Sequence, residues 1–137
     1  DIGFDYDKVY NFIYKVSEVL NDVLVPSFVH WDLWEGNVFV KDEKISGLID
    51  FERAMWTDPL MEYFFRANCH NKDFAAGFGV DLREKYPIKA NLYDLYLYSI
   101  LMIETKYRKY PDNNQYNFGA YEFKNAVNRL INYGYNL

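Results

Sequence analysis

The sequence predicts an α+β fold that is mainly α-helical and contains one small β-hairpin. Apolar residues recur at helical spacing near the amino terminus and again towards the carboxyl terminus, and between them two short apolar runs flank a charged turn. The chain has 137 residues, of which 50% are hydrophobic and 20% aromatic, enough to bury the core of one domain. We therefore treat residues 1–137 as a single domain.

The first predicted element is a helix that begins near Asp5. Asp5 or Asp7 supplies an N-cap, and Pro26 is expected to stop the helix. The apolar positions follow helical spacing: Val9, Phe12, Ile13, Val16, Leu20, Val23 and Leu24.

Two short strands are predicted next, at Val38–Val40 and Ile45–Ile49. The charged residues between them, 41–44 (KDEK), suit an exposed turn. No Asn-Gly or Asp-Gly pair fixes the turn type, and we place its centre at Glu43-Lys44.

A second helix is predicted from Asp58-Pro59, where Asp58 is the N-cap and Pro59 the first helical residue. Glu62 then falls in the acidic first turn, and the side expected to be buried carries Leu60, Phe64 and Ala67. Residues 71–86 have two glycines, mixed charges and no clear period, so we expect mostly loop.

Two more helices are predicted in the carboxyl-terminal part of the chain. The first ends before Pro111, and one of its faces carries Leu92, Leu95, Tyr96, Ser99, Met102 and Ile103. The second ends before Gly134 and repeats the pattern with Phe123, Val127, Leu130 and Ile131.

Composition narrows the function classes. A formal net charge of −5 argues against a nucleic-acid partner and favours a cationic or metal-neutralised one. No apolar run is long enough for a membrane span, and the first residues do not resemble a signal peptide. The only cysteine, Cys69, forms no internal disulfide, and neither it nor His70 has a metal-binding or nucleophile pattern around it. We expect a cytoplasmic protein that does not contact the membrane.

The chemistry concentrates in FVHWDLWEGNVFV, residues 28–40. His30-x-Asp32-Leu33-x-x-x-Asn37 matches the catalytic-loop pattern of kinases, in which the Asp accepts the proton of the attacking hydroxyl and the Asn binds magnesium. A second carboxylate, Asp50, ends the next apolar run. Each of these residues taken alone is usually a cap or an Asx-turn, so the prediction rests on their joint spacing.

The sequence resembles the aminoglycoside phosphotransferase family of small-molecule kinases, which includes choline- and fructosamine-kinase-like enzymes. Three motifs in this order carry the resemblance: HWDLWEGN, GLIDFERA and TDP. The resemblance implies the carboxyl-terminal lobe of a protein-kinase-like fold and the use of ATP and Mg²⁺. It further implies that Asp32 is the catalytic base, that Asn37 and Asp50 are the Mg²⁺ and nucleotide ligands, and that His30 is the structural histidine of the catalytic loop.

Two positions depart from the family pattern. The residue after the motif histidine is usually glycine and is Trp31 here. The acidic residue after the Asp-Pro pair is commonly aspartate and is Glu62 here, so no role is transferred to it.

A physical argument also points to a metal site. If the hairpin turns at Glu43-Lys44, Asn37 and Asp50 lie opposite each other, because both are equally far from the turn. Opposed residues of antiparallel strands have Cα atoms about 4.5–5.5 Å apart, so an amide and a carboxylate oxygen would converge as a hard cation requires. Mg²⁺ held there would bring the ATP phosphates close to Asp32.

Several kinase motifs are missing from the sequence. Neither a G-x-G-x-x-G loop nor a V-A-I-K-like strand occurs, although a kinase needs both to hold its nucleotide. We therefore expect residues 1–137 to be a carboxyl-terminal lobe that lacks the amino-terminal nucleotide lobe, is inactive alone and can dimerise through the exposed lobe interface. The chain between Asp50 and Asp58-Pro59 is too short to contain an activation loop. This favours a small-molecule hydroxyl acceptor over a protein acceptor.

Two function classes stay open at this point. The first is the lobe of an active ATP-dependent small-molecule phosphotransferase, and the second is a non-catalytic, pseudokinase-type binding module. Choline-like, amino-sugar and glycated-amine acceptors are all compatible with the sequence. Trp31 and Trp34 are interpreted as packing residues, with a substrate platform as the alternative.

Overall fold

The computed structural model describes residues 5–23, 25–62, 76–77 and 85–135. The chain divides into two compact units. One contains Asp1–Asp22 and Tyr86–Leu137 and is helical, and the other, Val23–Lys85, contains the strands. We call them the helical unit and the strand unit and describe each by itself.

The helical unit begins with α1, Tyr6–Val16. The Asp5 side chain accepts hydrogen bonds from the backbone N–H groups of Asp7 (3.1 Å) and Lys8 (3.2 Å), which confirms the predicted N-cap. The predicted extension to Pro26 is wrong, since α1 passes into a 3₁₀ turn at Ser17–Leu20 (η1). The Ser17 hydroxyl donates to the Tyr14 carbonyl at 2.8 Å, a local bond that competes with continuation of the helix.

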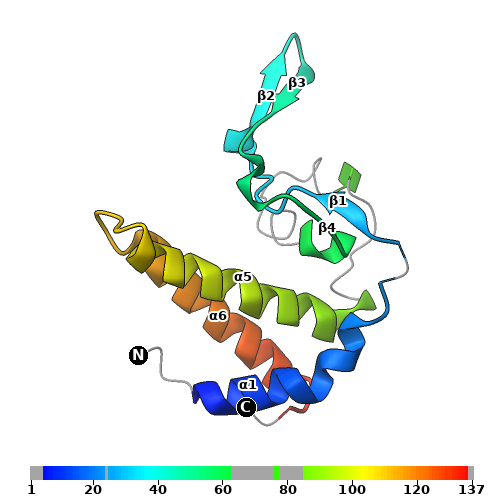
Figure 1. The fold of residues 1–137 in the computed structure, drawn as a ribbon, viewed down its shortest axis with the longest axis vertical. Helices are drawn as coiled ribbons and strands as arrows, with labels where there is room; N and C mark the ends of the chain where they lie inside the picture. The colour runs from blue at the N-terminus through cyan, green and yellow to red at the C-terminus, as the bar shows by residue number, and fades with distance from the viewer. Residues whose placement is uncertain (1–4, 24, 63–75, 78–84, 136–137) are drawn as a thin grey trace. The chain divides into compact units, whose positions relative to one another are not determined.

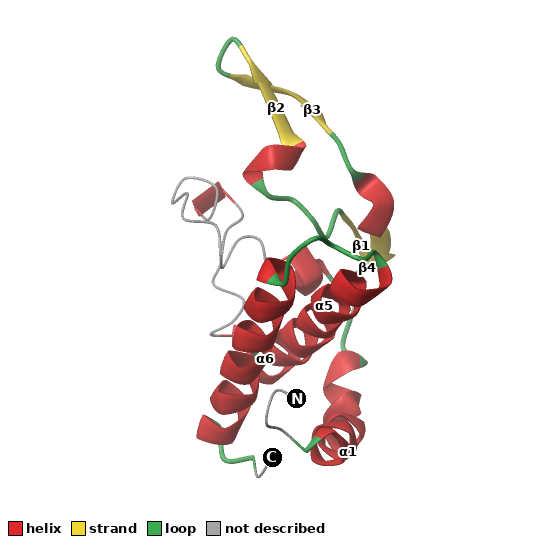
Figure 2. Ribbon diagram, turned by 90° about the vertical axis from the view of Figure 1, so that its left-hand side faces the viewer, coloured by secondary structure: helices red, strands yellow, loops and turns green. Residues whose placement is uncertain are grey.

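Two long helices, α5 (Pro87–Tyr107) and α6 (Asn114–Asn132), run side by side in both views of the chain (Figures 1 and 2). Their predicted existence and approximate ends are confirmed. The predicted buried face of α5 is only partly right, because Tyr96 is 53% exposed and Ile103 65% exposed. α5 is apolar on almost every side, so its sequence does not single out the face that packs. The residues that it buries include Leu92, Leu95, Leu97, Tyr98, Leu101 and Met102.

A glycine lets α5 and α6 approach closely. A Cβ atom on Gly119 of α6 would stand 3.1 Å from the backbone oxygen of Tyr98 and 3.1 Å from Cγ of Met102 in α5. The core of the pair lies beside this contact, where Leu97, Ala126, Val127 and Leu130 have no exposed surface.

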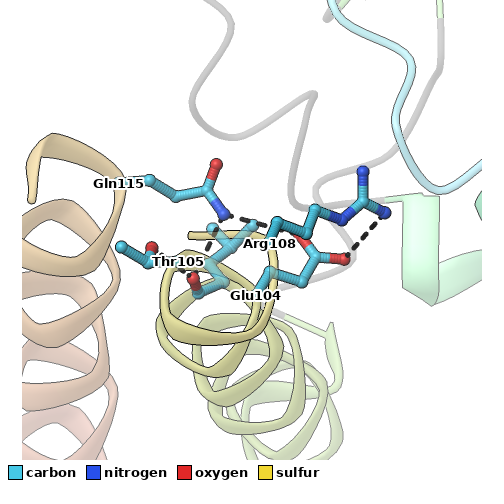
Figure 3. A network of polar contacts seen from close by, with 5 residues as sticks. Glu104, Thr105, Arg108 and Gln115 are labelled. Atoms are coloured by element: carbon cyan, nitrogen blue, oxygen red, sulfur yellow. Dashed lines mark hydrogen bonds and ion pairs between the residues drawn. The ribbon is translucent and has the colours of Figure 1, made fainter. Parts of the chain in front are cut away.

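Polar contacts fix the turn between the two helices (Figure 3). Gln115 Nε2 donates to the Leu101 carbonyl at 3.1 Å and to Glu104 Oε2 at 3.4 Å. The other oxygen of Glu104 pairs with Arg108 at 3.6 Å, and the Thr105 hydroxyl donates to the same Leu101 carbonyl at 3.0 Å. The last turns of α5 are thereby attached to the first turn of α6.

The end of α6 has the geometry of a Schellman motif. Gly134 has φ +89°, and its N–H donates to the carbonyl of Ile131 (2.8 Å). The N–H of Tyr135 donates to the carbonyl of Leu130 (3.3 Å). The predicted stop at Gly134 is confirmed. The Tyr135 ring then packs edge-on against Phe12 of α1, with ring centroids 4.8 Å apart.

Charged groups buried in the helical unit are paired. Arg129 of α6 donates to Asn91 Oδ1 at 2.7 Å and to Asp94 Oδ2 at 2.8 Å, both on α5. Lys89, only 5% exposed, pairs with Asp22. These bonds satisfy groups that would be costly to bury alone.

The strand unit contains two antiparallel strand pairs. β2 (Val38–Lys41) and β3 (Lys44–Leu48) form the predicted hairpin. Its turn lies at Asp42 and Glu43, one residue before the predicted position, and both residues have positive φ (51° and 61°), as a type I′ turn requires. The other pair, β1 (Ser27–Val29) with β4 (Met55–Thr57), was not predicted.

After β4 the predicted cap is confirmed, since Asp58 Oδ1 accepts from the Leu60 N–H at 2.9 Å. The element that follows is a 3₁₀ turn, Pro59–Glu62 (η4), as far as the structure describes it. Predictions for Phe64, Ala67, Cys69 and His70, and for most of the loop at 71–86, fall outside the described residues. No helix in the described ranges is both long and apolar enough to cross a bilayer.

Candidate active site

The segment from Asp32 to Asn37 folds into a loop that its own hydrogen bonds close. The Asn37 amide donates through Nδ2 to the Asp32 carbonyl at 2.8 Å. Inside the loop, the Trp34 N–H donates to the same carbonyl (3.0 Å) and the Asn37 N–H to the Trp34 carbonyl (2.9 Å). Asp32 is half-buried and Asn37 only 5% exposed, so both ends of the loop are fixed.

His30 connects this loop to the strand that precedes Asp50. Its Nε2 lies 2.8 Å from the carbonyl oxygen of Ile49, and because a carbonyl only accepts, this nitrogen carries the hydrogen. The other ring nitrogen, Nδ1, is buried without a hydrogen-bond partner among the described residues. The ring also packs on Phe51, with centroids 4.5 Å apart.

The predicted pairing of Asn37 with Asp50 is wrong by one residue. The Ile49 N–H donates to the Asn37 carbonyl at 3.1 Å, so Ile49 is the residue that faces Asn37. The turn is centred one residue earlier than expected, which alone would place Leu48 opposite Asn37. A bulge opposite Phe39/Val40 leaves Ser46 without a Cα partner and moves the pairing back by one residue, to Ile49.

Asp50 leaves the strand in a left-handed conformation, with φ 64° and ψ 53°, and its side chain is exposed. A 3₁₀ turn, Phe51–Arg53 (η3), follows at once. Aspartate adopts this conformation more readily than most residues. Asp50 therefore stands one residue beyond the position that faces Asn37, at the same end of the hairpin.

Glu62 is a site residue that the sequence analysis missed. Its Oε2 accepts the N–H of His30 at 2.7 Å and its Oε1 accepts the N–H of Trp31 at 3.0 Å. The carboxylate is buried, with only 7% of the residue exposed. The available signal was the acidic position after the Asp-Pro pair, but only the fold brings it to residues about 30 positions away.

Trp31 has φ 57°, which is strained for a bulky side chain, and it is 3% exposed. This conformation explains why glycine is usual at the position in the family that the motif resembles. The bond from the Trp31 N–H to Glu62 holds the strained peptide in place.

Burial raises the pKa of the Glu62 carboxyl above its usual value, because removal from water penalises the charged form. The two backbone hydrogen bonds and the nearby His30 act in the opposite direction, and the negative charge of Asp32 adds to the rise. Proton uptake at Glu62 would turn one of its two acceptor oxygens into a hydroxyl.

The donor types at this end of the hairpin suit a hard cation. Asn37 uses its amide nitrogen on Asp32, which leaves the amide oxygen as a ligand, and Asp50 offers an exposed carboxylate. In the described part of the chain, no three His, Cys, Asp or Glu side chains gather as a complete ligand set. This pattern fits Mg²⁺, which takes one or two protein oxygens and completes its shell with water and substrate phosphates.

Comparison with known proteins identifies the family. The model of the phosphotransferase enzyme family matches residues 7–94, more than half of the chain. The chain belongs to this family. The match confirms the resemblance found in the motifs, and it extends from α1 through the candidate site into α5. No curated protein and no solved structure matched the chain.

Proposed function

We propose that the whole protein transfers the γ-phosphoryl group of ATP to a hydroxyl group of a small molecule, in a reaction that requires Mg²⁺. The observation that carries this proposal is the closed Asp32–Asn37 loop, which His30 connects to the strand leading to Asp50. Membership of the phosphotransferase family supports the reaction class.

Asp32 is the proposed catalytic base. The hydroxyl oxygen of the acceptor attacks the γ-phosphorus, the bond from that phosphorus to the β–γ bridging oxygen breaks, and the hydroxyl proton passes to the Asp32 carboxylate. Asn37 and Asp50 would hold Mg²⁺, which when bound neutralises charge on the phosphate oxygens. His30 and Glu62 position the loop through the backbone and take no proton from the acceptor.

One face of the hairpin suits the nucleotide base. Side chains alternate along a strand, so Phe39 and its partner Gly47 share a face, and Ile49 lies on the same side. Phe39 is 54% exposed and Ile49 45% exposed, and a Cβ on Gly47 would meet nothing within 4 Å. A flat purine resting on this open apolar face would leave its phosphates at the end of the hairpin that carries Asn37 and Asp50.

The sequence supports a larger assembly around this lobe. Because it contains no glycine-rich phosphate loop and no lysine strand of the kinase type, we propose that residues 1–137 form the carboxyl-terminal lobe of a protein-kinase-like fold. An amino-terminal lobe would then close over the nucleotide, and the exposed lobe interface would allow the isolated chain to dimerise. The 137-residue chain alone is accordingly expected to show no ATP turnover above a blank.

Two substitutions in the whole protein test the proposed roles, after a screen for a hydroxyl acceptor of radiolabelled phosphate. Asp32→Asn should lower kcat by about 10²–10⁴-fold, the range for a lost general base, with nucleotide binding retained. Asp50→Ala should weaken Mg·ATP binding as well. Asp42→Asn makes the same chemical change as Asp32→Asn on the exposed hairpin turn and serves as the matched control.

A non-catalytic, pseudokinase-type binding module is the second candidate, and Trp31 favours it. A buried indole with positive φ stands at the usual glycine position, immediately before Asp32 in the chain. For such a module, the acceptor screen would detect no transfer, and Asp32→Asn would leave every measured ligand affinity unchanged.

A further inference from the structure

A groove on the helical unit is built from residues other than those of the candidate active site. α1 contributes Tyr6 to its lining, α6 contributes Tyr116, and α5 contributes Met102, Ile103 and Tyr107. The groove has a volume of about 740 Å³. Small-molecule sites usually measure about 300–1,000 Å³ and have mainly apolar walls, so this groove has the size and the lining of a binding site.

The walls of the groove are apolar and open to solvent. Ile103 is 65% exposed and Tyr107 86% exposed, while Met102, at 9%, forms the more buried part of the lining. The Ser99 hydroxyl also lines the groove, but it donates to the Leu95 carbonyl at 2.7 Å and is already bonded within the helix. Large apolar side chains that stay exposed around a depression mark an interaction site.

One positive charge stands among these apolar side chains. Among the described residues that line the groove, Lys106 alone is charged, and its Nζ lies 5.4 Å from the centre of the Tyr116 ring. This cation–π contact keeps the ammonium group at the groove. Glu104, the acidic residue nearest to Lys106 along α5, is bonded to Gln115 and Arg108 instead (Figure 3). Lys106 forms no ion pair with any described residue, so its charge is available to a ligand.

We propose that this groove binds an amphipathic monocarboxylate, an apolar molecule that carries a single carboxylate group. The apolar body would cover Met102 and Ile103, and the carboxylate would pair with Lys106. One positive charge matches one negative charge, and a hydrogen bond between two charged groups is stronger than one between neutral groups. The inference does not depend on the proposed phosphotransferase function, because it uses no residue of that site.

The test uses ligands that share one apolar tail and differ in charge: decanoate, neutral decanamide and the decyltrimethylammonium cation, each below its micelle-forming concentration. Binding to the whole protein is followed by NMR of isotope-labelled methionine methyl groups, assigned by methionine-to-leucine substitution. Met102 lines the groove, whereas Met55 and Met61 belong to the strand unit and report unspecific effects. We expect decanoate to shift only the Met102 resonance, saturably, and to bind more tightly than decanamide, with the cation binding most weakly.

Substitutions separate the charge from the apolar wall. Lys106→Met removes the charge and keeps an unbranched side chain, so the Kd of decanoate should rise about 3- to 30-fold while that of decanamide stays unchanged. Lys124→Met, at an exposed lysine of α6 outside the groove lining, is the matched control and should change neither Kd. Ile103→Glu places a negative charge in the wall and should abolish decanoate binding, whereas Ile103→Gln should only weaken it. Because Ile103 is exposed, both variants should fold, which circular dichroism checks.

Several results would overturn the inference. Equal affinities for decanoate and decanamide would show that Lys106 does not select the ligand. No shift at Met102, or shifts only at Met55 or Met61, would show that the groove does not bind the carboxylate. A Met102 resonance that moves with protein concentration and not with decanoate would make the groove a contact between copies of the chain. None of these results depends on phosphoryl transfer, so this inference and the proposed function can fail separately.

Discussion

The helical unit and the strand unit differ in the balance of apolar and polar groups that they bury. The helical unit has an apolar core in which Leu97, Val127 and Leu130 are fully buried, and its buried polar residues Lys89, Asn91 and Asp94 are paired. Among its described residues, the strand unit buries as many polar side chains as apolar ones, and each polar one binds or supports the catalytic loop or the turn beside it: His30, Asn37, Asp58 and Glu62. Stability and site geometry therefore depend on separate sets of residues.

Backbone strain follows the same division. Among the described non-glycine residues, positive φ occurs in the strand unit at Trp31, Asp42, Glu43 and Asp50, and in the helical unit at Lys109. Trp31 and Asp50 flank the candidate site, where strained conformations persist because neighbouring contacts hold them. The comparison predicts that substitutions in the apolar core of the helical unit change the free energy of unfolding, whereas substitutions at the buried polar groups around the catalytic loop change catalysis.

The largest expected effect is a loss of stability caused by a substitution in the core of the helical unit. Leu130→Ala removes a fully buried side chain and should lower the free energy of unfolding by about 2–5 kcal/mol. Activity per folded molecule should stay at the wild-type level. Urea titration followed by circular dichroism, with kcat measured at low urea, checks both statements. Ile131→Ala, at a 40% exposed neighbour, is the control and should cost much less. A kcat that fell in step with stability would contradict the division.

The next largest effect is a loss of kcat caused by a substitution at a buried carboxylate of the strand unit. Glu62→Gln keeps the shape of the side chain but leaves one acceptor oxygen for two backbone N–H groups, those of His30 and Trp31. A lost hydrogen bond to a charged group costs about 1.5–3 kcal/mol, so kcat should fall about 10- to 100-fold. Steady-state kinetics on the whole protein measures this. Glu43→Gln, on the exposed hairpin turn, controls for the loss of a carboxylate and should leave kcat unchanged.

A smaller effect depends on pH. The pKa of Glu62 is raised by burial, so its proton should return at a pH above the usual range for glutamate. Protonation removes an acceptor, and kcat should decline as pH falls through the raised pKa. The stability contribution has the opposite sign: it is complete below the unfolded-state pKa and lost as pH rises through the folded-state pKa. Both dependences should be absent from Glu62→Gln, and a retained kcat step would assign the titration to another group.

The smallest effect concerns the strained backbone of the hairpin turn, which, unlike that of Trp31 and Asp50, is not expected to serve catalysis. Glu43→Gly changes the hairpin turn to Asp-Gly, the pair preferred in type I′ turns, at a residue with φ 61°. Relief of this conformation should stabilise the hairpin by about 0.5–1 kcal/mol. Slower hydrogen exchange of the β2–β3 amides, with unchanged kcat, is the expected result. Faster exchange would show that the Glu43 side chain stabilises the turn.

The sequence predicted the features that depend on neighbours in the chain. The Asp5 cap, the end of α6 at Gly134 and the existence of the β2–β3 hairpin all follow from local patterns. The motifs HWDLWEGN, GLIDFERA and TDP likewise sufficed to find the family. Periodicity failed on α5, whose apolar residues cover more than one face.

Features that depend on distant contacts were not predictable in this way. β1 and β4 are three residues each and pair across the intervening hairpin, so neither has enough length to show a pattern. The bulge at Ser46 shifts the register, and Gly47 beside it, although glycine inside a strand often marks a bulge, does not by itself give the position of the extra residue. The contacts of Glu62 join residues 32 and 31 positions apart, and only the folded chain brings them together.

The bonds that frame the catalytic loop share one property: each side chain binds a main-chain atom. His30 binds the carbonyl of Ile49, Asn37 that of Asp32, and Glu62 two peptide N–H groups. The side chains at positions 31 and 49 thus contribute nothing to these bonds and are open to replacement. Substitutions at these two positions can therefore change the residue next to Asp32 and the proposed nucleotide face while the backbone that holds the reacting groups keeps its place.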